Sequence, residues 1–255
     1  MPDIAVRSLT KHFGQVRAVD GLTFDVPAGR VTGFLGPNGA GKTTTLRMML
    51  GLVHPTTGEA LIGGRHYAEL PQPRRTVGAV MEAIGFHPGR SGRDHLRILA
   101  QVSDTPEARV AEVLDLVDLT EAAARRVKGY SLGMRQRLGL AAALLGDPQV
   151  LLLDEPANGL DPKGMAWLRD LLRGLAAEGR TVLISSHVLS EIAQTVDQVV
   201  IISDGRLRYA GSLEELGGSG AALEAAFLRL TDGDGAAPRR LVAEGAHLQS
   251  REEDR

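Results

Sequence analysis

The sequence predicts an α/β fold with a parallel-sheet core, an N-terminal antiparallel β subdomain and an inserted α-helical subdomain. A glycine-rich stretch at residues 36–44 lies between the expected strand Val31–Leu35 and an expected helix that ends at Gly51. The run Val150–Leu153 is continuously apolar, which is typical of a strand buried on both faces of a parallel sheet. From about residue 82 to residue 146 the periodicity becomes helical, which indicates an insertion.

Composition restricts the classes of protein that this chain can belong to. Its 255 residues are enough to bury a full core as one domain with an insertion. The formal charge is −2 with scattered basic residues, so we expect no nucleic-acid partner. The absence of cysteine excludes disulfides and thiol chemistry. No apolar run approaches the ~20 residues that cross a bilayer and the N-terminus lacks a signal-peptide pattern, so we expect a chain that is soluble by itself.

Short apolar runs outside the central strands predict two strands of an antiparallel sheet and two further strands. These runs are 3–10, 22–26, 59–62 and 76–81. Gly14 and Asp20-Gly21 separate the first two runs, and Gly63-Gly64 is an expected turn between the last two. Phe13 is open to two interpretations, since an aromatic side chain beside strands packs in a core or stacks on a nucleobase.

The inserted region predicts helices at 94–102, 107–117 and 131–145. The last of these begins unusually, because Arg135 and Arg137 lie in the first turns, where the helix dipole disfavours cations. Either an anion docks at the preceding residues 130–133, or Ser131 is an N-cap followed by solvated arginines.

Residues 36–44 fit the phosphate-binding pattern G-x-x-x-x-G-K-[ST] at every required position. Converging backbone N–H groups and a helix N-terminus bind phosphate, Lys42 reaches the β- and γ-phosphates, and the Thr43 hydroxyl ligates Mg²⁺. The competing interpretation is a glycine-rich turn with a solvated lysine. The predicted nucleotide contacts are Gly36, Pro37, Asn38, Gly39, Ala40, Gly41, Lys42, Thr43 and Thr44.

Two carboxylates, Asp154 and Glu155, follow the apolar strand at its C-terminal end. Ligands of open α/β sheets collect at that edge, so Asp154 is predicted to hold Mg²⁺ and Glu155 to polarise a water; solvated acids in a surface turn are the alternative. Asp161-Pro162 begins an expected helix that runs to Glu178. A further strand at 181–184 ends in Ser185-Ser186-His187, which places His187 at the same edge, as a structural or a catalytic group.

The C-terminal third predicts a hairpin and one more helix. Runs 198–203 and 207–210 flank Asp204-Gly205, a strong hairpin signal, and a glycine-rich linker precedes a short helix at 221–230. Residues 232–255 are rich in Gly, Ala, Pro and charge, so we expect a disordered tail.

Together these motifs resemble the ATP-binding cassette (ABC) transporter ATPases over about residues 3–216. The loop resembles that family's Walker A motif, 150–155 its Walker B strand with the catalytic glutamate, and 130–137 its signature sequence. Asn158-Gly159-Leu160-Asp161 resembles the D-loop, His187 the switch histidine and Phe13 the aromatic residue that stacks on adenine.

The resemblance implies a P-loop NTPase core that hydrolyses ATP with Mg²⁺. Its members act as head-to-tail pairs, so Ser131 and the Gly133 backbone of one copy would contact the γ-phosphate bound by a second copy, and Asp161 of the D-loop is a further nucleotide-binding residue. Lys42, Glu155 and His187 would then be the catalytic residues. Glu82 stands where the family has a glutamine and is a candidate ligand of Mg²⁺, beside Thr43 and Asp154.

The signature departs from the usual Leu-Ser-Gly-Gly-Gln, because Leu132 replaces the first glycine and Met134 the glutamine. This variant, Glu82 and the ending at 223–228 resemble the bacterial exporter branch of daunorubicin-type and bacitracin-type resistance ATPases. The implied function is ATP-driven export of a drug, antibiotic or lipid-like substrate through a separate membrane permease, at the cytoplasmic face of the membrane. The alternative is a soluble ABC-type ATPase that acts on ribosomes or DNA.

The expected organisation follows from these assignments. Residues 1–216 form the ATPase domain, with the helical subdomain at about 82–146. Residues 217–231 form a linker and a short helix, and 232–255 form the tail.

Overall fold

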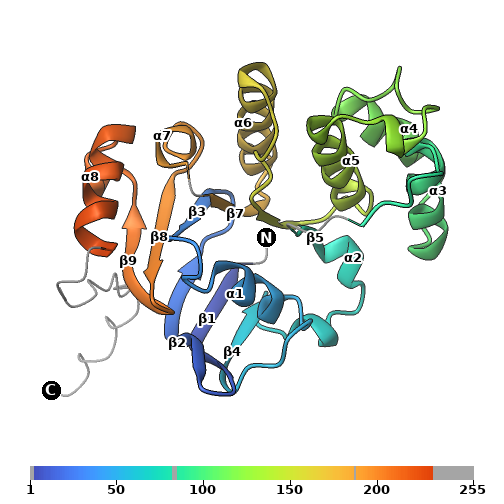
Figure 1. Cartoon of the computed structure of the whole chain (residues 1–255). Helices are drawn as coiled ribbons and strands as arrows, with labels where there is room; N and C mark the ends of the chain where they lie inside the picture. The colour runs from blue at the N-terminus through green and yellow to red at the C-terminus, as the bar shows by residue number, and fades with distance from the viewer. Residues whose placement is uncertain (1–2, 82–84, 187, 232–255) are drawn as a thin grey trace, which may run out of the picture.

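The predicted fold class is confirmed. The computed structural model describes residues 3–81, 85–186 and 188–231, which form a mixed α/β structure with one antiparallel and one mainly parallel sheet (Figure 1). None of the helices in these ranges is both long and apolar enough to cross a membrane.

The N-terminal sheet is antiparallel, with strand order β2-β1-β4. Its strands are β1 (Ile4–Phe13), β2 (Val16–Val26) and β4 (Thr57–Ile62). The expected break at Asp20-Gly21 is wrong, because β2 continues through it. Gly21 takes φ +65° and its N–H donates to Thr10 Oγ1 at 2.9 Å, so the positive φ is absorbed as an irregularity within the strand.

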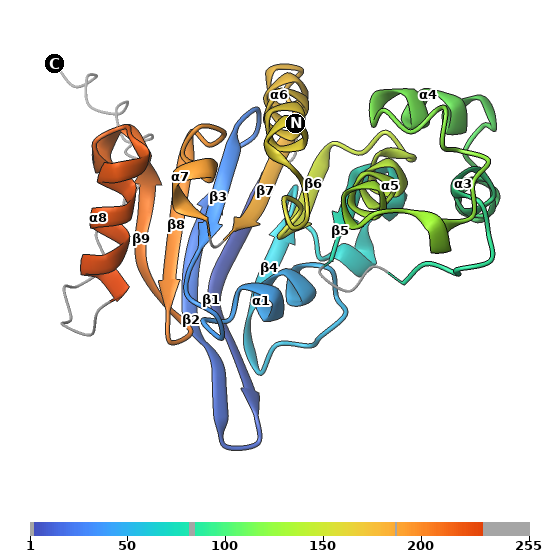
Figure 2. The ribbon, with the colours of Figure 1, turned by 45° about the horizontal axis from the view of Figure 1, so that its top comes forward.

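The second sheet has the order β5-β6-β7-β3-β8-β9 and is parallel except for the edge strand β9 (Figure 2). Its strands are β3 (Val31–Leu35), β5 (Val77–Val80), β6 (Val150–Asp154), β7 (Thr181–Ser186), β8 (Gln198–Ser203) and β9 (Arg206–Ser212). β4 and β5 therefore belong to different sheets, although Gly63-Gly64 was expected to join them by a turn. The hairpin at Asp204-Gly205 is confirmed by the antiparallel pairing of β8 with β9.

The parallel sheet lies between two apolar layers, which explains its uninterrupted apolar strands. In β6, Leu151 and Leu153 pack into one cluster, and Val150 and Leu152 pack into the other. The first cluster is completed by helices of the inserted region and of the C-terminal half, and the second by the N-terminal sheet and α1 (Lys42–Met49). Both faces of β6 are therefore buried, as the sequence predicts.

The inserted region is helical, with α3 (Gly92–Val102), α4 (Ala108–Leu116) and α5 (Leu132–Leu144). These helices group beyond the β5 edge of the sheet in both views (Figures 1 and 2). α3 begins at Gly92, two residues before the expected start, because Ser91 caps it: the Ser91 hydroxyl accepts the Asp94 N–H at 3.1 Å.

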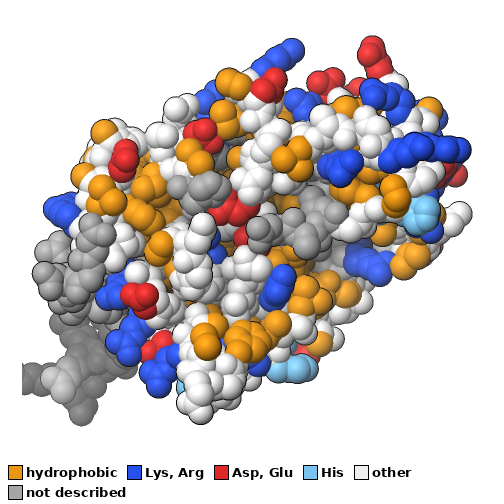
Figure 3. Space-filling view, viewed as in Figure 1, with side chains coloured by type: hydrophobic (Ala, Val, Ile, Leu, Met, Phe, Trp, Pro, Cys, Tyr) orange, Lys and Arg blue, Asp and Glu red, His pale blue; other side chains and the backbone are white. Residues whose placement is uncertain are grey.

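The remaining helices connect or cover the strands. They are α2 (Pro73–Thr76), α6 (Pro162–Ala177), α7 (Leu189–Ile192) and α8 (Gly220–Thr231), with 3-10 turns at Tyr67–Glu69, Val127–Gly129 and Glu214–Leu216. α8 packs on α7 and the β8–β9 edge, where Leu223 and Ala226 are fully buried. On the face shown in Figure 3, basic side chains are interspersed with acidic and apolar ones.

Candidate functional site

The phosphate loop connects β3 to α1, as the motif requires. Two of its glycines are needed for close approach: a Cβ at Gly36 would lie 2.5 Å from the Ile202 carbonyl oxygen, and one at Gly41 would lie 2.5 Å from that of Ala18. Gly41 also takes φ +102°, a backbone region that only glycine adopts without strain. The loop is thus pressed between β8 and β2, with its N–H groups at the start of α1.

Lys42 folds back over this loop. Its side chain is buried, and Nζ donates to the carbonyl oxygens of Gly36 at 2.6 Å and of Pro37 at 3.3 Å. The interpretation of a solvated lysine is therefore wrong. The ammonium group is held against the loop whose N–H groups are expected to bind phosphate, which is where a phosphate-binding cation is required.

Asp154 is the centre of a buried hydroxyl and carboxylate cluster. It is 1% exposed, Thr43 Oγ1 donates to its Oδ2 at 2.8 Å, and Ser185 Oγ donates to its Oδ1 at 2.7 Å. Three elements, α1, β6 and β7, thus supply one polar group each. The alternative of solvated acids is wrong for Asp154. No role for Ser185 was predicted from the sequence. The pattern that could have indicated one is the polar pair Ser185-Ser186 at the end of β7, which lies next to β6.

Glu155 follows Asp154 in a left-handed backbone conformation, with φ +50°. Its N–H donates to Ser185 Oγ at 2.9 Å, so the same hydroxyl fixes both acidic residues. Left-handed φ in a non-glycine residue costs about 1 kcal/mol or more and is often retained at functional sites.

The loop and the two acids line one hollow of about 440 Å³. Its lining residues are Ala18, Asn38, Gly39, Ala40, Gly41, Lys42, Thr43, Thr44, Asp154, Glu155 and Asn158. Most of the residues predicted to bind nucleotide or metal are thus brought together, while Ala18 and Asn158 were not predicted there.

Ser131 and Gly133 line a separate hollow of about 780 Å³, together with Asp161. Ser131 is the N-cap of α5 and accepts the Met134 N–H at 3.1 Å, and Asp161 is the N-cap of α6 and accepts the Gly164 N–H at 2.8 Å. The two hollows share no residue. The structure therefore places Ser131, Gly133 and Asp161 together, apart from the phosphate loop of the same chain.

The expectation of solvated arginines after an N-cap is half right. Ser131 is an N-cap and Arg135 is exposed. Arg137, in contrast, donates to Val117 O and Asp118 Oδ2, both at 3.1 Å, and lies 4.3 Å from the centroid of the Trp167 ring. Its charge is used to join α5 to α6 and to the end of α4.

Phe13 does not belong to the core, so that interpretation is wrong. Its side chain is 49% exposed at the end of the β1–β2 hairpin, and Lys11 Nζ lies 5.0 Å from its ring centroid. Stacking of Phe13 on adenine stays a prediction. Two other predicted site residues, Glu82 and His187, lie outside the described residues.

Comparison with known proteins agrees with this geometry. The sequence pattern of the ABC transporter family matches residues 19–158. A bacitracin transport ATP-binding protein of Bacillus licheniformis is 45% identical over 207 residues, which cover 80% of this chain and 68% of that protein. A lantibiotic transport ATP-binding protein of Streptococcus pyogenes is 35% identical over 219 residues, or 84% of this chain and 95% of that protein.

A solved structure of the ATP binding subunit of an ABC transporter superimposes with a TM-score of 0.80 at 28% identity, covering 89% of this chain and 98% of that one. The family match spans both the phosphate loop and the β6 acids, which are the residues that the structure gathers in one hollow. The chain therefore belongs to the ABC transporter family, as an ATP-binding subunit that is an ATPase.

Proposed function

We propose that this chain hydrolyses ATP in a head-to-tail pair and thereby drives export through a separate membrane permease. The observation that carries the pairing is the separation of the two hollows. Ser131, Gly133 and Asp161 lie together but away from Lys42 and its loop, so a second copy is needed to place them at the same nucleotide.

In this proposal the chain's own groups position the reactants. Glu155 orients or deprotonates the water that attacks the γ-phosphorus, and the bond to the β-phosphate oxygen breaks to leave ADP and phosphate. Lys42 neutralises charge that develops on the transferred phosphoryl group, and His187 contacts the γ-phosphate. Phe13 stacks on the adenine.

The donor set fits Mg²⁺ as the cofactor. Thr43 Oγ1 and Asp154 Oδ2 would be hard oxygen ligands; they lie 2.8 Å apart, and both residues line the phosphate hollow. Mg²⁺ at phosphates typically uses one or two protein groups and keeps several waters. Bound Mg²⁺ would offset the negative charge of the phosphates.

The transport assignment is supported by the relatives. Two of them are ATP-binding proteins of bacitracin and lantibiotic transport. We infer an antibiotic or lipid-like cargo for this chain, carried by a permease that holds the ATPase at the cytoplasmic face of the membrane. Glu82 and the inserted helices transmit the opening and closing of the pair to that permease.

Replacement of Glu155 tests the catalytic assignment. Glu155→Gln keeps the shape of the side chain but removes its basicity, so we expect ATP turnover to fall by about 10²-fold or more. The same variant should form an ATP-stabilised pair in size-exclusion chromatography. The matched control is Glu224→Gln, an exposed side chain on α8, which should keep the parent rate and form no such pair. Hydrolysis by Glu155→Gln at the parent rate would refute the assignment.

Co-purification tests the transport assignment. A tagged chain expressed in its source cell should retain a protein with several membrane-spanning segments after detergent extraction. Salt-sensitive association with RNA or ribosomes in place of that protein would instead favour the soluble alternative.

A further inference from the structure

Leu132, one of the two residues that depart from the usual signature, lies against a glycine of a neighbouring loop. Leu132 is the first residue of α5, and its side chain is 59% exposed. It lies over Gly159: a Cβ added at Gly159 would lie well under 3.0 Å from both Cγ and Cδ2 of Leu132. The Leu132 side chain thus occupies the space that a side chain at position 159 would need.

The next residue of α5 approaches the same segment from its backbone. A Cβ at Gly133 would lie 3.1 Å from the Gly159 carbonyl oxygen and 3.4 Å from Leu160 Cδ2. Residues 158–161, which we term the 158–161 loop, are therefore packed against the start of α5 by a side chain and a close backbone contact.

The 158–161 loop also connects the two hollows. The Asn158 N–H donates to Glu155 O at 3.2 Å, and Asn158 lines the phosphate hollow. At its other end, Asp161 caps α6 and lines the hollow of Ser131. A side chain that fixes this loop consequently fixes the spacing between Ser131 and Asp161, and also the backbone that carries Glu155.

We propose that Leu132 is a positioning residue. Its side chain fills the space beside the Gly159 backbone, where a larger residue would have its own side chain, and so holds the 158–161 loop against α5. This sets the relative placement of Ser131 and Asp161 on the surface that meets the nucleotide of a second copy, and in that part it rests on the proposed function. A glycine at position 132 leaves the loop without this support, so Leu132 and Gly159 act as a matched pair.

Amide hydrogen exchange of the nucleotide-free chain tests the contact without reference to pairing. The Leu160 N–H donates to Ala157 O at 3.0 Å within the loop. In Leu132→Ala the amides of Asn158 and Leu160 should exchange several-fold faster, because the loop opens locally more often. The matched control is Leu52→Ala, whose side chain is 66% exposed, and it should leave these amides unchanged. Unchanged exchange in Leu132→Ala would overturn the proposal.

A double-mutant cycle tests the functional consequence. Gly159 has φ +79°, so alanine there is strained whatever stands at position 132, but only the Leu132 background adds a steric overlap. Gly159→Ala should therefore lower kcat for ATP by about tenfold more in the parent than in Leu132→Gly. Equal losses in both backgrounds would show that the two positions are independent and would overturn the proposal.

Two further readouts separate positioning from simple destabilisation. In Leu132→Ala, kcat should fall, while KM for ATP and the Tm change little because the phosphate loop is untouched. In Leu132→Met, kcat should stay close to that of the parent, because the methionine side chain covers Gly159 again. A loss of kcat in Leu132→Ala that is fully accounted for by a lower Tm would overturn the positioning role. Failure of Glu155→Gln to form an ATP-bound pair, with the exchange effect of Leu132→Ala intact, would instead remove the proposed function and leave the loop contact standing.

Discussion

The most constrained residue of the phosphate hollow is Asp154. A buried carboxylate is costly unless its oxygens accept hydrogen bonds, and here Thr43 and Ser185 supply one to each oxygen. The Ser185 hydroxyl also accepts the Glu155 N–H, so one small side chain orients both acids. Its position on the neighbouring strand β7 makes the site sensitive to sheet register as well as to side-chain identity.

Removing that hydroxyl should affect both stability and activity. Ser185→Ala leaves an Asp154 oxygen and the Glu155 N–H without their partner, so we expect the free energy of unfolding to fall by about 1–3 kcal/mol, with a lower kcat. Urea denaturation and steady-state ATP hydrolysis measure the two effects. The exposed Ser190→Ala should change stability by less than about 0.5 kcal/mol. A wild-type stability in Ser185→Ala would contradict the role of this hydroxyl.

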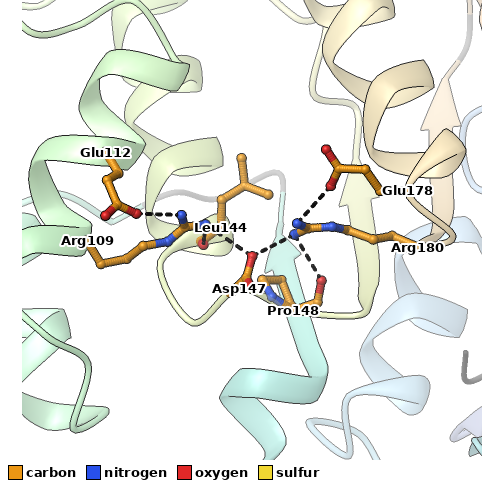
Figure 4. Close-up of polar contacts among 7 residues, drawn as sticks. All are labelled: Arg109, Glu112, Leu144, Asp147, Pro148, Glu178 and Arg180. Carbon is orange, nitrogen blue, oxygen red and sulfur yellow. Dashed lines mark hydrogen bonds and ion pairs between the residues drawn. The ribbon is translucent and has the colours of Figure 1, made fainter.

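At the scale of elements, the inserted helices are tied to the core by side chains as well as by packing. Arg109 of α4 and Arg180, which follows α6, both bind Asp147 Oδ1, at 3.2 and 3.0 Å (Figure 4). Arg109 also donates to Leu144 O at 3.3 Å, and Arg180 to Pro148 O at 3.4 Å. Asp147 therefore bridges the inserted region and the core where α5 ends.

The Asp147 bridge gives a prediction with a built-in control. Asp147 has φ +52°, which asparagine tolerates well, so Asp147→Asn removes the charge at little backbone cost. We expect a loss of about 1 kcal/mol at low salt that shrinks in high salt, because these partly exposed ion pairs are screened. Urea unfolding at two salt concentrations measures it. Asp170→Asn, whose Arg169 contact is highly exposed, should have almost no effect. A salt-independent loss would contradict an electrostatic bridge.

Within α3, His95 makes stability depend on pH. Burial, with a smaller contribution from the charge of Arg90, lowers the pKa of His95 below its ordinary value of 6.5. The His95 ring packs edge-on against Phe86, with 4.9 Å between the ring centroids. Below pH 6.5 the unfolded chain therefore takes up a proton that the folded chain does not, so the free energy of unfolding falls until the folded pKa is passed. His95→Gln should flatten this decline between about pH 7 and about pH 5 in urea titrations. An unaltered pH profile would contradict it.

At the scale of the whole molecule, α8 is part of the packed structure. Leu223 is fully buried where α8 meets α7, whereas Leu228 on the same helix is 50% exposed. Leu223→Ala should lower the free energy of unfolding by about 2–5 kcal/mol, because it leaves a cavity. Leu228→Ala should cost well under half as much. Thermal and urea unfolding measure both, and a loss in Leu223→Ala no larger than the small one expected for Leu228→Ala would mean that α8 contributes little to the core.

Much of this architecture could be predicted because it depends on local patterns. The loop motif places Lys42 and Thr43 at a strand-to-helix junction, and the apolar run before Asp154 places that acid at the edge of the same sheet. Gly21 was misread because a glycine at positive φ serves an irregular strand as well as a turn.

Contacts between residues distant in sequence could not be predicted. Ser185 reaches Asp154 only because β7 lies beside β6, and the order of the strands in the sheet cannot be predicted from the residues of either strand. The contact between Leu132 and Gly159 likewise could not be predicted, because the two residues belong to separate motifs that only the fold brings together. Grouping of Asp161 with Ser131 depends on how α5 and α6 pack, which no single motif determines.

The separation of the two hollows has a genetic consequence. If each complete site draws on two copies, a copy with Lys42→Ala and a copy with Ser131→Ala, each inactive alone, complement each other in a mixed dimer, where one site receives both intact halves. Random assembly from equal amounts should restore about a quarter of the sites. Lys42→Ala mixed with Thr43→Ala, two lesions in the same half, should restore none. Two defective alleles of this gene, one with each substitution, would thus complement each other when both are expressed in one cell.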